Sequence, residues 1–321
     1  MWNEIKRIDD EAENVAKFVY TKDDAVVESV LYKYPTYEER TVICCSTQSG
    51  CPVGCRFCGA GDYFVRNMTS EEIVDQVDYS IEQTSIKAEQ MKKLQVMFMS
   101  QGEPLLNLNS LIPAMRILYD KYPDAKLLIS TSGPSIKTKA WWDLLDVSID
   151  IPNIGLQFSV HESTNEARNN LVPFKAKMTL EDMAAHGLLW YLTMKLADKN
   201  PNVVRNPFFN YCAHEGNSSD EDADRLFKLY NPKVFNATVS VICEREQGMS
   251  KTNDKQRQLA VDFSSKLLER GYDVRVFDPA GQDTIGGGCG QLHFVQDWFK
   301  ENPDKVRKSI GYGRSVIHAP T

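Results

Sequence analysis

The sequence predicts an α/β fold in which buried parallel strands alternate with helices, as an open sheet or a barrel. Short apolar runs recur along the 321 residues and are continuous rather than alternating, which is typical of strands covered on both faces. Helical segments with clear starting signals lie between these runs. Polar, Gly-rich or Cys-rich loops follow the strands, and in a β/α barrel such loops meet at one end, where active sites lie.

Residues 17–22 and 25–34 predict a hairpin around Asp23 and Asp24, placed before the barrel. The strands expected after it span residues 41–46, 94–99, 126–130, 154–160, 208–212, 237–242 and 272–277. Helices are expected after a capping box formed by Thr69 and Glu72, over 218–230, and over 254–271 with Gly271 at its end.

Three segments follow from this order. We expect an N-terminal extension with a hairpin over residues 1–40, a barrel core over 41–295, and a C-terminal helix with a basic tail over 296–321. The basic stretch KVRKSIGYGR at 305–314 is typical of a solvated tail or of an RNA contact.

Composition narrows the classes of function. A net charge of -7 argues against a broad, non-specific nucleic-acid surface but allows a local basic groove. No apolar run approaches the length of a membrane span, and the charged N-terminus does not resemble a signal peptide. We therefore expect a cytoplasmic protein without membrane association. In that reducing compartment, clustered cysteines indicate metal binding or catalysis rather than disulfides.

Five of the eight cysteines lie between positions 44 and 58, in CCSTQSGCPVGCRFC. Cys51, Cys55 and Cys58 have the spacing C-x3-C-x2-C, which suits three irons of a [4Fe–4S] cluster and leaves the fourth iron open. A zinc site is the alternative, with Cys44 or Cys45 as the fourth ligand. The aromatic residue before the last cysteine and the position of the loop after a strand favour the iron–sulfur cluster.

This cysteine motif resembles that of the radical S-adenosylmethionine (SAM) superfamily. The resemblance implies that the open iron binds SAM, that an electron from the cluster cleaves SAM to a 5'-deoxyadenosyl radical, and that the fold is a partial (β/α)6-type barrel. Longer sequence motifs occur in the order typical of one group; they are GEPLLNLN, STSG, SVHESTNEARNNLVP and GGCGQL. Over roughly residues 15–295 the chain closely resembles the RlmN/Cfr group of RNA methyltransferases, which methylate adenine at C2 or C8.

The resemblance implies roles for individual residues. Cys289 matches the cysteine that accepts a methyl group, Cys44 the cysteine that resolves the covalent intermediate, and Glu28 the general base. Cys243 falls at or near the position of an asparagine that contacts SAM in many members. The residues implied around SAM are Gly102, Glu103, Ser130, Ser159 and His161.

The two distant cysteines suit the chemistry of an electrophilic aromatic carbon. A thiolate takes the methyl group first, by displacement, and delivers it to the base as a carbon radical. Proton loss and attack by a second thiol then release the product and leave a transient disulfide. The expected substrate is adenine in ribosomal or transfer RNA, with C2 favoured over C8. A flavodoxin or ferredoxin is the expected electron donor.

Several alternatives stay open. Members of the group usually carry an N-terminal helical domain of about a hundred residues, whereas some fifteen residues precede the hairpin here. The same chemistry on a small nucleotide or metabolite, a radical-SAM reaction without methyl transfer, and a zinc-binding interaction protein are the competing functions. Glu103 with Pro104 also suits a simple helix start, Cys289 and Cys212 suit packing, and His161 suits a hydrogen-bonded strand end. Cys45 and Cys44 should face opposite ways.

Overall fold

The computed structural model describes residues 2–12, 14–197, 205–241, 254–286, 292–306 and 308–309. The main sheet contains β1 (Glu4–Asp10), β2 (Val15–Lys22), β3 (Ala25–Lys33), β4 (Thr41–Cys45), β7 (Leu94–Phe98), β8 (Lys126–Thr131), β9 (Ile154–Ser159), β10 (Phe208–Cys212), β11 (Asn236–Ser240) and β12 (Val274–Phe277). A small second sheet contains β5 (Gln48–Gly50), β6 (Tyr63–Asn67) and β13 (Lys308–Ser309). The α-helices are α1 (Ser70–Glu82), α2 (Leu108–Lys121), α3 (Thr138–Asp150), α4 (Asn165–Leu171), α5 (Leu180–Leu196), α6 (Asp220–Leu229), α7 (Asp254–Glu269) and α8 (His293–Glu301).

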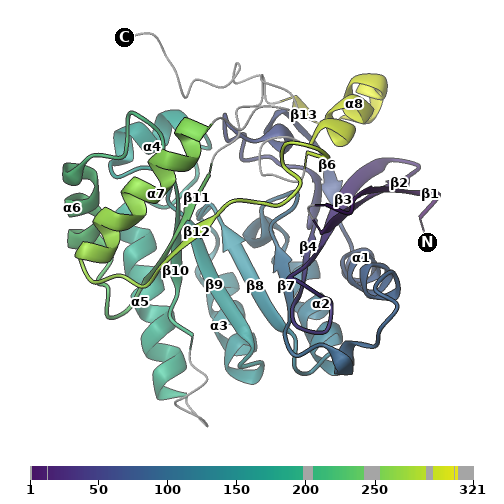
Figure 1. The fold of residues 1–321 in the computed structure, drawn as a ribbon, viewed down its shortest axis with the longest axis horizontal. Coiled ribbons are helices and arrows are strands. Elements are labelled where there is room, and N and C mark those ends of the chain that lie inside the picture. Colours follow the sequence, from purple (N-terminus) through teal and green to yellow (C-terminus); the bar gives the residue numbers. More distant parts are fainter. Residues whose placement is uncertain are drawn as a thin grey trace.

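The fold is an α/β partial barrel built on the main sheet, as the sequence predicts. Its ten strands follow the order β1-β2-β3-β4-β7-β8-β9-β10-β11-β12, and the strands from β4 onward are parallel. Helices α1, α2, α3 and α5 pack along the outside of the curved sheet (Figure 1). Each strand from β4 to β11 is followed by a helix, because a crossover is needed to bring the next parallel strand alongside.

The N-terminal strands join this sheet directly. β2 and β3 pair as the expected hairpin, with Val19 opposite Glu28, and β3 then pairs antiparallel with β4. The hairpin is therefore continuous with the barrel rather than merely preceding it. The edge strand β1, which the sequence analysis did not predict, pairs with β2.

The outer core forms where alternate strand residues face the helices. Ile43, Val96 and Leu127 from neighbouring strands pack against α1 and α2 residues such as Ile73 and Leu111. Helix α1 starts at the predicted capping box, in which the Glu72 N–H donates to Thr69 Oγ1 over 3.2 Å and the Thr69 N–H donates to Glu72 Oε2 over 3.0 Å. These local signals fix where the crossover helix begins and hence how it covers the sheet.

The segment after β12 crosses the open side of the barrel toward β1 and β2. The Thr284 hydroxyl donates to Asp10, and Ile285 packs with Val15 and Val30 on the interior face of the sheet. This crossing brings the residues that lead toward Cys289 back to the N-terminal strands. In the described part of the chain, no helix has both the length and the apolar character needed to cross a membrane.

Candidate functional site: a cysteine-lined cavity at the end of the barrel

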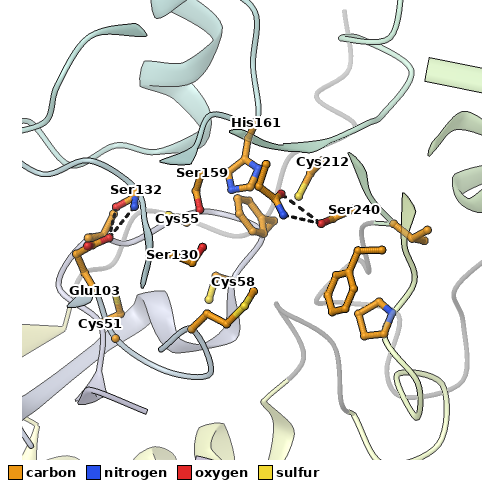
Figure 2. A pocket seen from close by; sticks show the side chains of 18 residues that line it. Cys51, Cys55, Cys58, Glu103, Ser130, Ser132, Ser159, His161, Cys212 and Ser240 are labelled. Atoms are coloured by element: carbon orange, nitrogen blue, oxygen red, sulfur yellow. Dashed lines mark hydrogen bonds between the residues drawn. The ribbon is translucent and has the colours of Figure 1, made fainter. Parts of the chain in front are cut away.

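One cavity at the carboxyl ends of the parallel strands gathers most of the predicted site (Figure 2). Its walls include the three motif cysteines, Cys51, Cys55 and Cys58, together with the five residues predicted around SAM, Gly102, Glu103, Ser130, Ser159 and His161. Four different loops or strand ends contribute these residues, as expected where the βα loops of a barrel converge.

Glycines and backbone hydrogen bonds hold the cysteine loop. Gly50 and Gly54 have φ values of +75° and +73°, and a Cβ at Gly50 would lie 2.1 Å from the Tyr63 carbonyl oxygen. The Cys51 N–H donates to that carbonyl over 2.7 Å, and the Cys58 N–H donates to the Cys55 carbonyl over 3.0 Å. The loop therefore presents its thiols from a fixed backbone.

Glu103 is a buried carboxylate that organises the loops around it. It accepts hydrogen bonds from the Thr131 hydroxyl and the Ser132 hydroxyl, both over 2.6 Å, and from the Ser132 N–H over 2.8 Å. It also caps a short 3-10 helix, Pro104–Asn107, by accepting from the Leu105 N–H over 3.0 Å. Burial raises the pKa of Glu103, and the hydrogen bonds from Ser132 and Thr131 oppose this. Glu103 thus both caps the short helix and lines the cavity.

His161 faces the cavity in a backbone conformation unusual for a residue with a side chain. Its φ is +62°, its ring lies edge-on to Phe57 at 5.1 Å, and its Nδ1 has no hydrogen-bond partner among the described residues. Burial lowers the pKa of His161 to about 3, with Arg168 adding to the effect. The ring is therefore neutral at physiological pH and offers one donor and one acceptor to a bound molecule.

Four lining residues with polar or thiol side chains, Ser132, Asn210, Cys212 and Ser240, were not predicted as site residues. Ser132 lies in the STSG word, and Asn210 bonds Ser240 over 2.9 Å across adjacent strands. Cys212, for which packing was expected, lies in an apolar cluster and also lines the cavity. Polar or thiol side chains within otherwise apolar β10 and at the end of β11 are the signal that would have indicated this wall.

Arg168 supports the cavity from behind. Its side chain is 1% exposed and donates to the backbone carbonyls of Val160, Ser132 and Met178 over 3.2, 2.5 and 3.2 Å. It therefore ties the ends of β8 and β9 to the loop after α4. The residue lies inside the word SVHESTNEARNNLVP, but nothing in its spacing indicates a buried role.

Cys44 and Cys45 face opposite ways, as alternation along β4 predicts. Cys45 is fully buried in the core beneath the helices. Cys44 points to the barrel interior, where its Sγ lies 3.9 Å from Met97 Sδ. Cys44 lines a second cavity, which shares Phe277 with the cavity that holds the three motif cysteines.

Glu28 lies on the same interior face of the sheet as Cys44. Cys44 is opposite Val30 across the β3–β4 ladder, and Glu28 is two residues from Val30 on the same side of β3. Glu28 Oε1 lies 3.1 Å from Lys17 Nζ, and Oε2 has no hydrogen-bond partner among the described residues. Burial raises the pKa of Glu28, and Lys17 opposes this.

Lys17 also touches both sides of the segment that carries Cys289. Its ammonium donates to the Gly286 carbonyl on one side and lies 6.0 Å from the Phe294 ring on the other. Cys289 and Cys243 themselves lie outside the described residues.

The three thiols suit a cluster better than a single zinc ion. Cys44 lines a different cavity, so it does not join Cys51, Cys55 and Cys58 as a fourth zinc ligand. Within the described ranges, no three His, Cys, Asp or Glu side chains gather around one ion position. A [4Fe–4S] cluster spreads three cysteines over three irons and needs no such convergence. Serine, asparagine and neutral histidine side chains line the rest of the cavity and suit the polar groups of SAM.

Comparison with known proteins gives the same assignment. The family model "Radical SAM superfamily" matches residues 45–193. A "Probable dual-specificity RNA methyltransferase RlmN" from Thermotoga neapolitana is 33% identical over 289 residues, covering 87% of this chain and 76% of the relative. One from Clostridium novyi is 30% identical over 303 residues, covering 90% of this chain and 79% of the relative.

Solved structures agree on the fold. A radical SAM methyltransferase from Sphaerobacter thermophilus superposes with a TM-score of 0.74 at 23% identity, covering 90% of this chain and 80% of that one. Streptococcus suis SuiB bound to S-adenosylmethionine gives a TM-score of 0.51 at 10% identity, covering 78% and 53%. With the cysteine-lined cavity at the end of a partial barrel, these likenesses show that the chain belongs to the RlmN/Cfr-type family of radical-SAM methyltransferases.

Proposed function

We propose that this enzyme methylates an adenine base in ribosomal or transfer RNA, at C2 rather than C8, through S-methyl Cys289 and a transient disulfide with Cys44. The curated relatives are named RNA methyltransferases, which supports RNA as the substrate. Cys51, Cys55 and Cys58 would hold the [4Fe–4S] cluster, with SAM between it and the polar cavity wall. A flavodoxin or ferredoxin in the cytoplasm would supply electrons.

The observation that carries the proposal is the position of Lys17 and Glu28. Lys17, which is paired with Glu28, donates to the carbonyl of Gly286, directly before the segment 287–291. It also lies 6.0 Å from the ring of Phe294, which follows that segment. The described residues that flank the segment bearing Cys289 therefore lie near the carboxylate predicted to act as base. Cys44 faces the same interior of the barrel. An acceptor thiol, a base and a resolving thiol are what this reaction needs in one chamber.

Each residue then has one task. When bound, SAM and the cluster supply the methyl group and the radical that activates it. Cys289 carries the one-carbon unit on its sulfur. Glu28, with one carboxylate oxygen unengaged among the described residues, takes the proton from the base carbon. The Cys44 thiolate attacks the Cys289 sulfur, so that the sulfur–carbon bond breaks and the methylated base leaves.

His161 and the serines act on the cofactor side of the chamber. A neutral imidazole and the hydroxyls of Ser130 and Ser159 offer hydrogen bonds to ribose, adenine or amino-acid groups of SAM without adding charge. Gly102 has a φ of +101°, and a Cβ there would lie 2.7 Å from the Gln48 backbone nitrogen. This position therefore accepts only glycine, because the backbone packs closely against Gln48 where it lines the cavity. Cys243 remains assigned to the SAM contact by resemblance alone.

The decisive experiment compares two neighbouring cysteines. Cys44→Ala should accumulate a covalent adduct between Cys289 and RNA, because nothing releases the bridging carbon. Cys45→Ala is the matched control, since its side chain is buried on the opposite face of the same strand. Cys289→Ala should give neither adduct nor product. Each variant is purified from cells and examined by gel shift and mass spectrometry.

Two outcomes would change the proposal. Normal turnover by Cys44→Ala would remove the two-cysteine mechanism. An adduct on a free nucleotide rather than on RNA would keep the mechanism and reassign the substrate to a small molecule.

A further inference from the structure

Five cationic side chains gather at the amino ends of the parallel strands, the end of the barrel opposite to the cysteine loop. They are Arg40, Lys93, Lys126, Arg205 and Arg275. The first two directly precede β4 and β7, and the third begins β8. The fourth lies three residues before β10, and the fifth is the second residue of β12. Residues far apart in the sequence therefore meet at one mouth of the barrel.

These charges act on one another. Burial, together with repulsion from Arg40, Arg205 and further cations of the group, lowers the pKa of Lys93. Burial and the charge of Arg275 likewise lower the pKa of Arg205. The five side chains thus form one field of like charge, which costs free energy unless an anion compensates it.

The protein itself supplies little compensation. The ion pairs among the described residues involve other cations throughout. The carboxylates whose charge acts on the group are Asp124, beside Lys126, and Asp273, beside Arg275. The group therefore holds more cations than carboxylates, in a protein whose net charge is -7.

Several guanidinium N–H groups also lack acceptors. Arg40 Nε, Arg205 Nη1 and Arg275 Nε are shielded from solvent and have no hydrogen-bond partner among the described residues. The other guanidinium contacts are long, 3.4 Å from Arg40 to Gln95 and 3.4 Å from Arg275 to Thr238. Unsatisfied, part-buried guanidinium groups are typical of a site that is completed by a ligand.

A cavity opens between these arginines and the interior of the barrel. It is lined by Tyr32, Tyr34, Arg40, Val42, Cys44, Met97, Arg275, Val276, Phe277 and Asp278. The one carboxylate in this wall, Asp278, accepts from Arg257 over 2.8 Å and from Gln282 over 2.6 Å. Its charge is therefore engaged away from the group, and the cavity keeps its positive character.

We propose that this mouth of the barrel, formed by the five cations and the cavity behind Arg40 and Arg275, binds a small anion carrying two linked phosphates. Guanidinium forks match phosphate oxygens in pairs, and the excess charge matches a pyrophosphate group. A small molecule fits better than a nucleic acid, because the unsatisfied N–H groups are withdrawn from the surface. The site adjoins the cluster cavity at Phe277 and has Cys44 in its wall, but its charge complementarity does not rest on the proposed methyl transfer.

The test measures binding of inorganic pyrophosphate to the full chain with its cluster, by calorimetry at fixed ionic strength. We expect saturable binding that is at least tenfold weaker in Arg275→Gln and in Arg40→Gln. Arg116→Gln is the matched control, because this exposed arginine on α2 pairs with Asp150 instead. Lys93→Gln, at an exposed side chain, keeps the test informative if an arginine variant folds poorly.

Thermal unfolding gives a second readout. Pyrophosphate should raise the midpoint temperature of unfolding of the wild type and of Arg116→Gln, but not that of Arg275→Gln or Arg40→Gln. Competition by a nucleoside diphosphate, compared with inorganic phosphate alone, identifies the source of the phosphates. Equal binding by all variants would overturn the site. So would binding of a single-stranded oligoribonucleotide through Arg40 and Arg275 when pyrophosphate does not bind.

Discussion

Lys17 Nζ lies 3.1 Å from Glu28 Oε1, and the two side chains are 0% and 1% exposed. Such a buried pair is sensitive to the loss of one partner, because the remaining charge has no solvent to stabilise it. Burial raises the pKa of Glu28 while Lys17 lowers it. Lys17 therefore opposes the protonation of Glu28 that burial favours, and it also lies near Gly286 and Phe294, which flank the segment that carries Cys289.

Replacing Lys17 by methionine should move the pH dependence of activity. A base works only when deprotonated, so activity falls as the pH drops through the pKa of Glu28. Without the opposing effect of Lys17 that pKa rises, and the acidic limb of the pH–rate profile should shift to higher pH. Stability should fall by about 3–5 kcal/mol, as measured by urea unfolding.

Lys6→Met is the control for Lys17→Met. The exposed Lys6 ammonium lies 5.0 Å from the same Phe294 ring. Among the described residues, the ion pair of Glu28 is with Lys17 and not with Lys6. Its replacement should leave the pH profile unchanged. An identical acidic limb in wild type and Lys17→Met would show that Glu28 is not the base.

Glu103 should affect both stability and cofactor binding. Glu103→Ala leaves the donors of Thr131, Ser132 and Leu105 without an acceptor, which should cost about 2–4 kcal/mol. If its charge also holds the amino group of SAM, affinity should fall by about tenfold to a hundredfold. Glu103→Gln keeps the shape and removes the charge, so it separates these effects in calorimetry. Unchanged SAM affinity in a folded Glu103→Gln protein would leave only the structural role.

Glu72 should contribute stability that is lost in acid. Burial opposes its ionisation, but hydrogen bonds from Arg66, Lys22 and the Thr69 N–H outweigh this and lower the pKa of Glu72 to about 2. The contribution is therefore present above the unfolded-state pKa of about 4.5 and disappears as the pH falls toward 2.

Glu72→Gln should lower the free energy of unfolding by about 1–3 kcal/mol at pH 7, with the difference shrinking between pH 4.5 and 2. Glu82→Gln, at an exposed position near the end of the same helix, is the control and should change stability little. A difference between Glu72→Gln and wild type that stays constant across this pH range would contradict the linkage.

The sequence predicts every strand of the main sheet except β1, and it does not predict the short strands β5, β6 and β13 of the second sheet. The runs that became β4 and β7 to β11 are apolar because both faces of each strand are covered, whereas β12 lies at the other edge of the sheet and is only partly buried. β1, EIKRIDD, is an edge strand whose side chains mostly reach water, so its pairing with β2 depends on backbone hydrogen bonds that composition does not encode. The division of the chain at residues 40 and 295 stays a prediction.

The candidate site shows the same limit. The cavity residues could be predicted from the sequence because they lie in short motifs that follow strands, such as STSG and SQGEP. Lys17 lies in a strand where a lysine is usually solvent-facing, and its partner Glu28 is on the next strand, so only the register brings them together. The five cations at the opposite mouth come from separate strand starts and share no sequence pattern at all.

The motif cysteines give the most direct test of the cluster. Cys55→Ala removes one of three expected iron ligands, so the cluster should not assemble and no SAM cleavage should occur. Cys212→Ala is the matched control, because this thiol lines the same cavity but lies outside the motif, on β10. It should retain iron, sulfide and the broad absorption near roughly 400 nm after anaerobic reconstitution. Because Cys55 lies on a loop held by its backbone hydrogen bonds, iron-free Cys55→Ala should unfold at the same urea concentration as the iron-free wild type. Deoxyadenosine formation by Cys55→Ala at the wild-type level would refute the assignment of the cluster to this loop.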